Sequence, residues 1–209
     1  MPDPVPRLGD LLAAAGHPHP RERVAAALRA EIAFYRANHD RGRDAPSLAE
    51  LRHDCARVLS AGLGRDAPPT ARLSELLVES LRFRLFPDAV PALDALAARG
   101  LRLAVVSNWD CDLPRLLGDL GVADRFGAIC VSAVVGAAKP DPAIFRHALG
   151  RLGVGPAAAL HCGDLPEADC AGARRAGVRA VLVDRRGTLP ESGCPRLRDL
   201  IGLASWAAS

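Results

Sequence analysis

Lysine is almost absent from this sequence, which contains one lysine, Lys139, and twenty-six arginines. Asparagine occurs only at Asn38 and Asn108, and methionine only at position 1. Such depletion is typical of a codon bias that replaces interchangeable lysines with arginines. A lysine that remains is expected where a compact ammonium, and not a wide planar guanidinium, must contact one oxyanion and one carboxylate. The sequence therefore singles out Lys139 as a candidate functional residue.

Aromatic residues are also scarce, at 4% of the chain, and the net charge is only +3. The arginines are scattered in pairs along the sequence and do not form one periodic basic face with aromatic residues between them. A nucleic-acid surface needs a contiguous basic footprint and usually stacking rings. We therefore expect no nucleic-acid partner.

Long hydrophobic runs are missing as well. The longest nearly uncharged stretch, 126–138, has thirteen residues and is too short to cross a bilayer. The N-terminus does not have the basic, apolar and small-residue pattern of a leader. These features predict a cytoplasmic protein with no membrane partner.

The six cysteines include no CxxC pair. Cys162 and its neighbour His161 would point to opposite faces of a strand, so they do not suggest a metal site. Free buried thiols are the default expectation for a chain of this size.

The 209 residues, of which 49% are apolar, suffice for a core domain with a smaller companion. Residues 1–84 are predicted to be an all-helical module, because apolar residues recur there at helical spacing and no convincing strand is found. Ser47 and Glu50 have the spacing of a capping box at the start of one of these helices.

Residues 85–209 instead alternate between helices and short apolar runs, as a parallel sheet covered on both faces requires. The sequence thus predicts an α/β core with a doubly wound parallel sheet. The expected strands cover residues 101–106, 129–131, 158–162 and 178–183, and the expected helices cover 88–99, 112–120, 141–152 and 166–176.

Polar residues follow three of these strands at their carboxyl ends, where open parallel sheets bind ligands. Ser107 and Asn108 follow the first, Lys139 opens a helix after the second, and Asp164 and Asp169 follow the third. The Ser107 hydroxyl and the Asn108 backbone N–H can donate to a phosphoryl or carboxylate oxygen, and Lys139 can neutralise it. Asp164 suits Mg²⁺, and Asp169 can ligate it directly or accept from a metal-bound water.

Each of these signals has a structural alternative. Ser-Asn after a strand is often a helix N-cap, and Gly-Asp is often a turn. Asp169 could simply be a carboxylate favoured by a helix dipole. Together, however, the residues predict a cation-assisted transfer at an oxyanion.

The same residues, in this order, resemble three motifs of the haloacid dehalogenase (HAD) superfamily, in the subgroup with a helical cap before the second motif. The matching segments are 105–110, 139–145 and 161–173, and the resemblance covers essentially the whole chain. It implies a HAD-like Rossmannoid core, catalytic roles for Ser107, Asn108 and Lys139, and metal ligation by Asp164 and Asp169. Mg²⁺-dependent phosphatases dominate this family, which also includes metal-free dehalogenases.

The family's first motif, a buried central strand that ends in the aspartate nucleophile, has no match in this sequence. Asp3 lies between prolines and Asp10 lies within a helical pattern, so neither follows an apolar strand. Asp184 follows a strand and precedes Gly-Thr-Leu, but Arg186 stands where the acid/base aspartate would be, and a turn is predicted there. Without the central strand, we expect either that the two strands beside it pair directly with each other or that the chain as written is poorly stable, because backbone groups buried unpaired at their edges are costly.

These observations predict a HAD-like hydrolase, with Mg²⁺-dependent hydrolysis of a small phosphorylated metabolite as the leading activity. The missing nucleophile leads us to expect a natural start about 10–20 residues upstream, a length that can form one strand. As written, the chain is expected to be inactive without such a motif. The alternatives are a catalytically inactive binding protein of the same fold and, more weakly, a metal-free haloacid dehalogenase.

Overall fold

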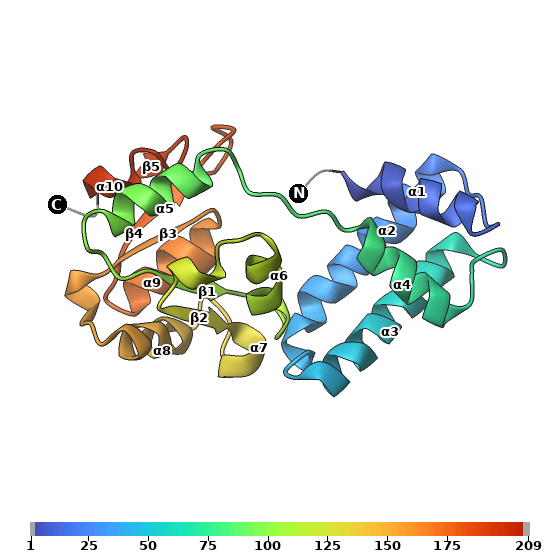
Figure 1. The fold of residues 1–209 in the computed structure, drawn as a ribbon, viewed down its shortest axis with the longest axis horizontal. Helices are drawn as coiled ribbons and strands as arrows, with labels where there is room; N and C mark the ends of the chain where they lie inside the picture. The colour runs from blue at the N-terminus through green and yellow to red at the C-terminus, as the bar shows by residue number, and fades with distance from the viewer. Residues whose placement is uncertain (1–2, 207–209) are drawn as a thin grey trace. The chain divides into compact units, whose positions relative to one another are not determined.

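A computed structural model describes residues 3–206, and the chain divides into two compact units after Arg84 (Figure 1). Each unit is described by itself below.

The N-terminal unit is helical throughout its described part. Its helices present leucines at three- and four-residue spacing to a shared interior, and Leu51, Leu59 and Leu73 are fully buried. Asp3 caps the first helix by accepting a hydrogen bond from the Val5 N–H at 3.0 Å. The helices are α1 (Pro4–Ala14), α2 (Arg21–Asn38), α3 (Ala45–Leu63) and α4 (Thr70–Ser80), with the 3₁₀ turn η1 (His39–Arg41).

The start of α3 differs from the predicted capping box of Ser47 with Glu50, which is wrong. Asp44 is the N-cap, and its carboxylate accepts from the Ser47 N–H at 2.9 Å. The Ser47 hydroxyl in turn accepts from the Asp44 N–H at 3.1 Å. An aspartate caps a helix as well as a serine does, so the helix begins three residues earlier than the serine suggested.

Glu31 is a buried carboxyl in this unit, with 6% of its surface exposed, and burial raises its pKa although Cys55 hydrogen-bonds to it. Because the folded pKa exceeds the unfolded value of about 4.3, stability falls as the pH rises through the folded pKa. Glu31→Gln is therefore expected to raise the free energy of unfolding at pH 7, and this gain should vanish near pH 4. Denaturant unfolding of both proteins at pH 7 and pH 4 measures this difference in the free energy of unfolding. Glu22→Gln, at an exposed site on α2, should change the free energy by less than about 0.5 kcal/mol at either pH.

The described part of the C-terminal unit has the predicted α/β character, and its five short strands form two parallel sheets and not one continuous sheet. Strand β1 (Ala104–Ser107) pairs with β2 (Ala128–Val131), and Val106 lies opposite Cys130. Strand β3 (Leu160–Gly163) pairs with β4 (Arg179–Val183), which also pairs with β5 (Arg196–Leu197). Strands β1 and β3 therefore each have one edge without a strand partner in the described part of the chain. The two strands thus do not pair with each other.

Both sheets nevertheless share one hydrophobic core, because the same helix packs on both. Ile144 and Phe145 of α8 (Pro142–Leu152) are buried and pack in one cluster with Val106 of β1 and Ala180 of β4. The other elements are α5 (Ala89–Ala97), α6 (Leu113–Asp119), η2 (Ala123–Arg125), α7 (Ser132–Val135), η3 (Pro156–Ala158), η4 (Pro166–Ala171), α9 (Gly172–Arg175) and α10 (Leu203–Trp206).

The predicted helix 166–176 is not a regular α-helix. Its first part, η4, is a π-helix, and only α9 continues as a short α-helix. Wide π turns are frequently found at functional sites. Here the wide turn carries Asp169, whose carboxylate accepts from the backbone N–H groups of Asp164 and Leu165 at the start of the turn.

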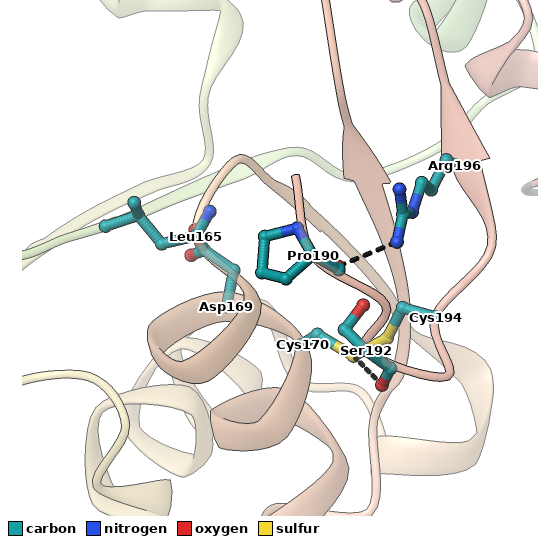
Figure 2. Close-up of a disulfide and its surroundings, with 7 residues drawn as sticks. All are labelled: Leu165, Asp169, Cys170, Pro190, Ser192, Cys194 and Arg196. Atoms are coloured by element: carbon teal, nitrogen blue, oxygen red, sulfur yellow. Dashed lines mark hydrogen bonds between the residues drawn. A yellow bond between two sulfur atoms is a disulfide. The ribbon is translucent and has the colours of Figure 1, made fainter. Parts of the chain in front are cut away.

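A disulfide joins Cys170 of η4 to Cys194 in the segment before β5, so the prediction of free thiols is wrong for this pair (Figure 2). The two cysteines are 24 residues apart in the sequence, and both are buried in one cluster with Leu182. The two cysteines are far apart in the sequence and form no CxxC pair, so no local pattern predicted that they are joined. The cysteines described as free thiols are Cys55, Cys111, Cys130 and Cys162.

Removal of this disulfide should destabilise the protein. For a closed loop of 24 residues, Cys170→Ala with Cys194→Ala is expected to lower the free energy of unfolding by about 3 kcal/mol, because the unfolded chain regains conformational freedom. Denaturant unfolding without reductant measures the loss, which should disappear when both proteins are unfolded in reductant. Thiol titration of the unreduced, denatured wild type should find four thiols, and a count of six would contradict the disulfide.

Candidate functional site

The candidate site lies at the carboxyl ends of β1 and β3, where the polar residues singled out in the sequence come together. Ser107 is the last residue of β1 and Asp164 directly follows β3. Lys139 lies in the loop before α8, and Asp169 lies in η4. The two strands belong to different sheets, so contacts between side chains must hold the site together.

Asn108 fixes the backbone of Lys139 through two hydrogen bonds. Its side-chain Nδ2 donates to the Lys139 carbonyl at 2.8 Å, and its Oδ1 accepts from the Lys139 N–H at 2.7 Å. This pairing is complementary in the same way as two peptide groups in a sheet. It ties the loop before α8 to the end of β1 and leaves the lysine side chain to make other contacts.

The Lys139 ammonium donates to Asp169 Oδ1 at 2.6 Å, with 12% of the lysine side chain and 2% of the aspartate side chain exposed. His161 Nε2 lies 2.9 Å from the same oxygen. The other oxygen, Oδ2, accepts from the Asp164 and Leu165 N–H groups at 3.0 and 2.9 Å. The Asp169 carboxylate is thus the acceptor for four donors.

Burial by itself would raise the pKa of Asp169, but the His161 hydrogen bond and the charge of Lys139 outweigh it and hold the pKa far below the usual range. Asp169 is therefore ionised at neutral pH, and its charge is matched by the ammonium. Its observed contacts hold the Lys139 ammonium in place. Direct metal ligation by Asp169 stays a prediction.

Asp164 and Ser107 differ from Asp169 in having no protein partner for their side chains among residues 3–206. Asp164 is exposed, and its contact with Asp169 uses its backbone N–H and not its carboxylate. The Ser107 hydroxyl is half-buried at the end of β1. These two groups are the ones that remain available for a ligand.

A cavity of about 400 Å³ lies beside Asp164, between the ends of β3 and β4. Its lining includes Gly163 and Asp164 of the site together with Phe86, Arg185 and Arg186. Arg185 is already engaged, because its guanidinium lies 3.9 Å from the centre of the Phe86 ring.

His161 was quoted within a sequence motif but was given no role, and it is the site residue that the sequence analysis missed. The available signal was the strand alternation, which puts His161 on the same face of β3 as Gly163. Gly163 is the residue against which the Asp169 carboxylate packs, so that face of β3 points to Asp169.

The structure contains no candidate nucleophile of the expected kind within residues 3–206. Asp3 caps a helix, and Asp10 lies within α1. Asp184 accepts from the Thr188 N–H at 3.0 Å and the Leu189 N–H at 3.2 Å, so the predicted turn is confirmed.

Two further features are absent from residues 3–206. No group of three or more histidine, cysteine, aspartate or glutamate side chains in the range 3–206 is placed to hold a metal ion. In that same range, none of the helices has the length and apolar character needed to span a membrane.

Comparison with known proteins places these residues in context. The family model for haloacid dehalogenase-like hydrolases matches residues 5–177. A phosphoserine phosphatase from Thermus thermophilus is 46% identical over 129 residues, which are 60% of this chain and 51% of that protein. A phosphoglycolate phosphatase from Rhodospirillum rubrum is 39% identical, covering 61% of this chain and 58% of that protein. The chain thus spans about half the length of the curated relatives it matches.

Solved structures agree with this family assignment. A 2-haloacid dehalogenase from Pseudomonas syringae superposes with a TM-score of 0.67 and 26% identity, covering 98% of this chain and 89% of that chain. A putative HAD-hydrolase from Bacillus subtilis, solved bound to magnesium, superposes with a TM-score of 0.72 over 99% of this chain and 92% of that chain. The identity with the latter is 20%, so it supports the fold alone.

Proposed function

The chain belongs to the haloacid dehalogenase-like hydrolases, and we propose that its site hydrolyses the phosphate ester of a small metabolite. The observation that carries this proposal is the fixed position of Lys139, whose ammonium is held by Asp169 and whose backbone is held by Asn108, the residue after Ser107. The similarity to phosphoserine and phosphoglycolate phosphatases supports a phosphate ester as substrate.

The site offers hydrogen-bond donors to a phosphoryl group from the end of β1 and from the loop before α8. The Ser107 hydroxyl and the Asn108 backbone N–H lie at the end of β1, and Lys139 lies in the loop that the Asn108 side chain ties to this strand end. Donors fixed before the substrate arrives stabilise charge on a transferring phosphoryl group without reorganisation. Asp169 contributes by fixing the ammonium, not by contacting the substrate.

The nucleophile is proposed to be an aspartate at the end of an additional strand. Strands β1 and β3 each have an edge without a strand partner in the described residues, and both of their sheets pack on α8. A parallel strand between them would satisfy the two edges and would end beside Ser107 and Asp164. Residues 1–84 are proposed to form the cap of the enzyme.

Mg²⁺ is the proposed cofactor, and Asp164 would hold it because its carboxylate is exposed and has no protein partner in the described range. Magnesium takes few carboxylates and keeps several waters, which suits one free aspartate plus the carboxylate of the added strand. When bound, the ion would neutralise charge on the phosphoryl oxygens.

A strand-addition experiment tests this proposal. A short apolar strand that ends in aspartate is fused before residue 1, and phosphate release is measured with phosphoserine, phosphoglycolate and glyceraldehyde 3-phosphate in the presence of Mg²⁺. The control fusion ends in asparagine, and a second control adds Lys139→Ala. We expect turnover by the aspartate fusion alone. If that fusion is folded and releases no more phosphate than the asparagine fusion, the proposal is wrong.

Two other functions follow from specific observations. An inactive ligand-binding protein is favoured by the lack of a nucleophile in the described chain, and predicts phosphate binding by the folded fusion without turnover. A metal-free haloacid dehalogenase is favoured by the similarity to the Pseudomonas syringae enzyme, and predicts halide release from a 2-haloacid that EDTA does not affect.

The cytoplasm remains the proposed location. The Cys170–Cys194 disulfide is the feature to weigh against it, because disulfides rarely persist in the cytosol of mesophiles. Thiol trapping in intact cells followed by mass measurement tests this point, and a fully oxidised pair would contradict the proposed location.

A further inference from the structure

His161 shares its acceptor atom with the lysine of the site. Its Nε2 lies 2.9 Å from Asp169 Oδ1, the oxygen that receives the Lys139 ammonium at 2.6 Å. Only 12% of the histidine side chain is exposed. This contact joins two protein groups, and it lies where it can affect the position of the Lys139 ammonium.

The direction of the hydrogen bond follows from the charge of its acceptor. The Asp169 carboxylate accepts from the Lys139 ammonium at Oδ1 and from two backbone N–H groups at Oδ2, so it is paired as an anion that can only accept. The proton of this hydrogen bond therefore lies on His161 Nε2. Two donors then approach one carboxylate oxygen, and each limits the directions open to the other. Because Oδ2 is held by two backbone N–H groups, rotation of the carboxylate would break contacts at both oxygens.

His161 is held at both its backbone and its ring. Its backbone is paired in β3, where it lies opposite Ala180 of β4. Its ring packs edge-on against Phe145 of α8, with 5.0 Å between the centroids and 89° between the planes. The Nε2 donor is therefore held in place by the pairing of β3 and by the ring contact with α8.

We propose that His161 is a positioning residue, which sets the place of the Lys139 ammonium by occupying one side of Asp169 Oδ1. This inference rests on the proposed function, in which that ammonium contacts the substrate oxyanion. It assigns the histidine no contact with substrate. Loss of the donor is expected to let the carboxylate turn and the ammonium move with it, while the ring contact with Phe145 can be kept or removed separately.

Three substitutions separate the donor from the ring. His161→Gln places an amide N–H at the same number of bonds from Cβ as Nε2, so it keeps the donor without the ring. His161→Asn carries the same amide, but its shorter side chain reaches only as far as Nδ1 would. His161→Phe keeps a ring against Phe145 and has no donor.

The chain offers a direct reporter, since Lys139 is its single lysine. Growth with ¹³C,¹⁵N-lysine labels one side chain, whose ε-methylene and ammonium signals are recorded by NMR at constant pH. Inorganic phosphate serves as the probe, and its affinity is measured from the same signals. Thermal unfolding of each variant, monitored by circular dichroism, separates effects on the lysine from effects on folding.

We expect His161→Gln to keep the lysine signals and a phosphate affinity within about twofold of the wild type. His161→Phe and His161→Asn should both shift the lysine signals and weaken phosphate binding by about five- to tenfold, the size expected when a charge-assisted contact is lost. The contrary pattern, in which Phe preserves the signals and Gln shifts them, would show that packing and not donation matters. Equal behaviour of all three variants would also overturn the proposal.

Failure of this inference can be told apart from failure of the proposed function. If the wild type does not bind phosphate, the proposed oxyanion site is wrong, but the lysine signals still compare the three variants. If phosphate binds and the Lys139 signals do not depend on the donor at position 161, the proposed oxyanion site is supported and the proposed role of His161 is wrong.

Discussion

Asp169→Ala is expected to lower the free energy of unfolding by about 3–5 kcal/mol, the range for removing one partner of a buried ion pair. The Lys139 ammonium would lose its partner in a place where 12% of its side chain is exposed. The N–H groups of Asp164 and Leu165 would lose their acceptor, at a cost of about 1–3 kcal/mol for each group that stays buried. Denaturant unfolding at pH 7 measures the change.

A nearby surface pair supplies the control. Glu167 and Arg175 form an ion pair at 2.7 Å in the same part of the chain, with 69% and 52% of their side chains exposed. Glu167→Gln should therefore change the free energy of unfolding by less than about 1 kcal/mol. Similar losses for the two variants would mean that Asp169 is not buried in its ion pair as the structure describes.

The pH dependence of the Asp169 effect has a definite sign. The folded pKa is depressed, so the stabilisation is complete above the unfolded pKa of about 3.9 and is lost as the pH falls through the folded value. The difference in stability between wild type and Asp169→Ala should thus be constant from pH 8 to about 5 and shrink below about 4. A difference in stability that already declines between pH 7 and 5 would contradict a folded-state pKa of Asp169 far below its usual range.

The sequence predicted the residues of the site better than their contacts. Lys139 and Asp169 were expected at the same edge of a parallel sheet, since polar residues that follow parallel strands gather there. The structure joins them in an ion pair. The order of helices and strands along the chain could be predicted because the apolar period and the glycines at turns are local signals.

The side-chain contacts could not be predicted in this way, because they join residues distant in sequence. Asn108 was expected to act through its backbone N–H, whereas its side chain is paired with the backbone of a residue 31 positions away. The disulfide between Cys170 and Cys194 could not be predicted for the same reason. The mistaken cap at Ser47 arose differently, since Asp44 and Ser47 are both good capping residues and only geometry decides between them.

Gly163→Ala is expected to be as damaging as the loss of the Asp169 carboxylate itself. A Cβ atom at Gly163 would overlap the carbon and the Oδ2 oxygen of that carboxylate. Because Asp169 is buried and held by four donors, it cannot move aside without breaking some of those hydrogen bonds. We expect a loss of roughly 3–4 kcal/mol in the free energy of unfolding, from overpacking together with the broken contacts.

Gly150→Ala is the matched control for this substitution. Gly150 lies in α8, and an added Cβ there would meet nothing within 4 Å. Alanine within a helix is favoured over glycine by about 0.5–1 kcal/mol, so this variant should be slightly more stable than the wild type. Combining Gly163→Ala with Asp169→Ala should cost much less than the sum of the two single changes, since the first acts by displacing the group that the second removes. Additive losses would mean that the glycine is needed for the course of β3 itself and not for the close approach of Asp169.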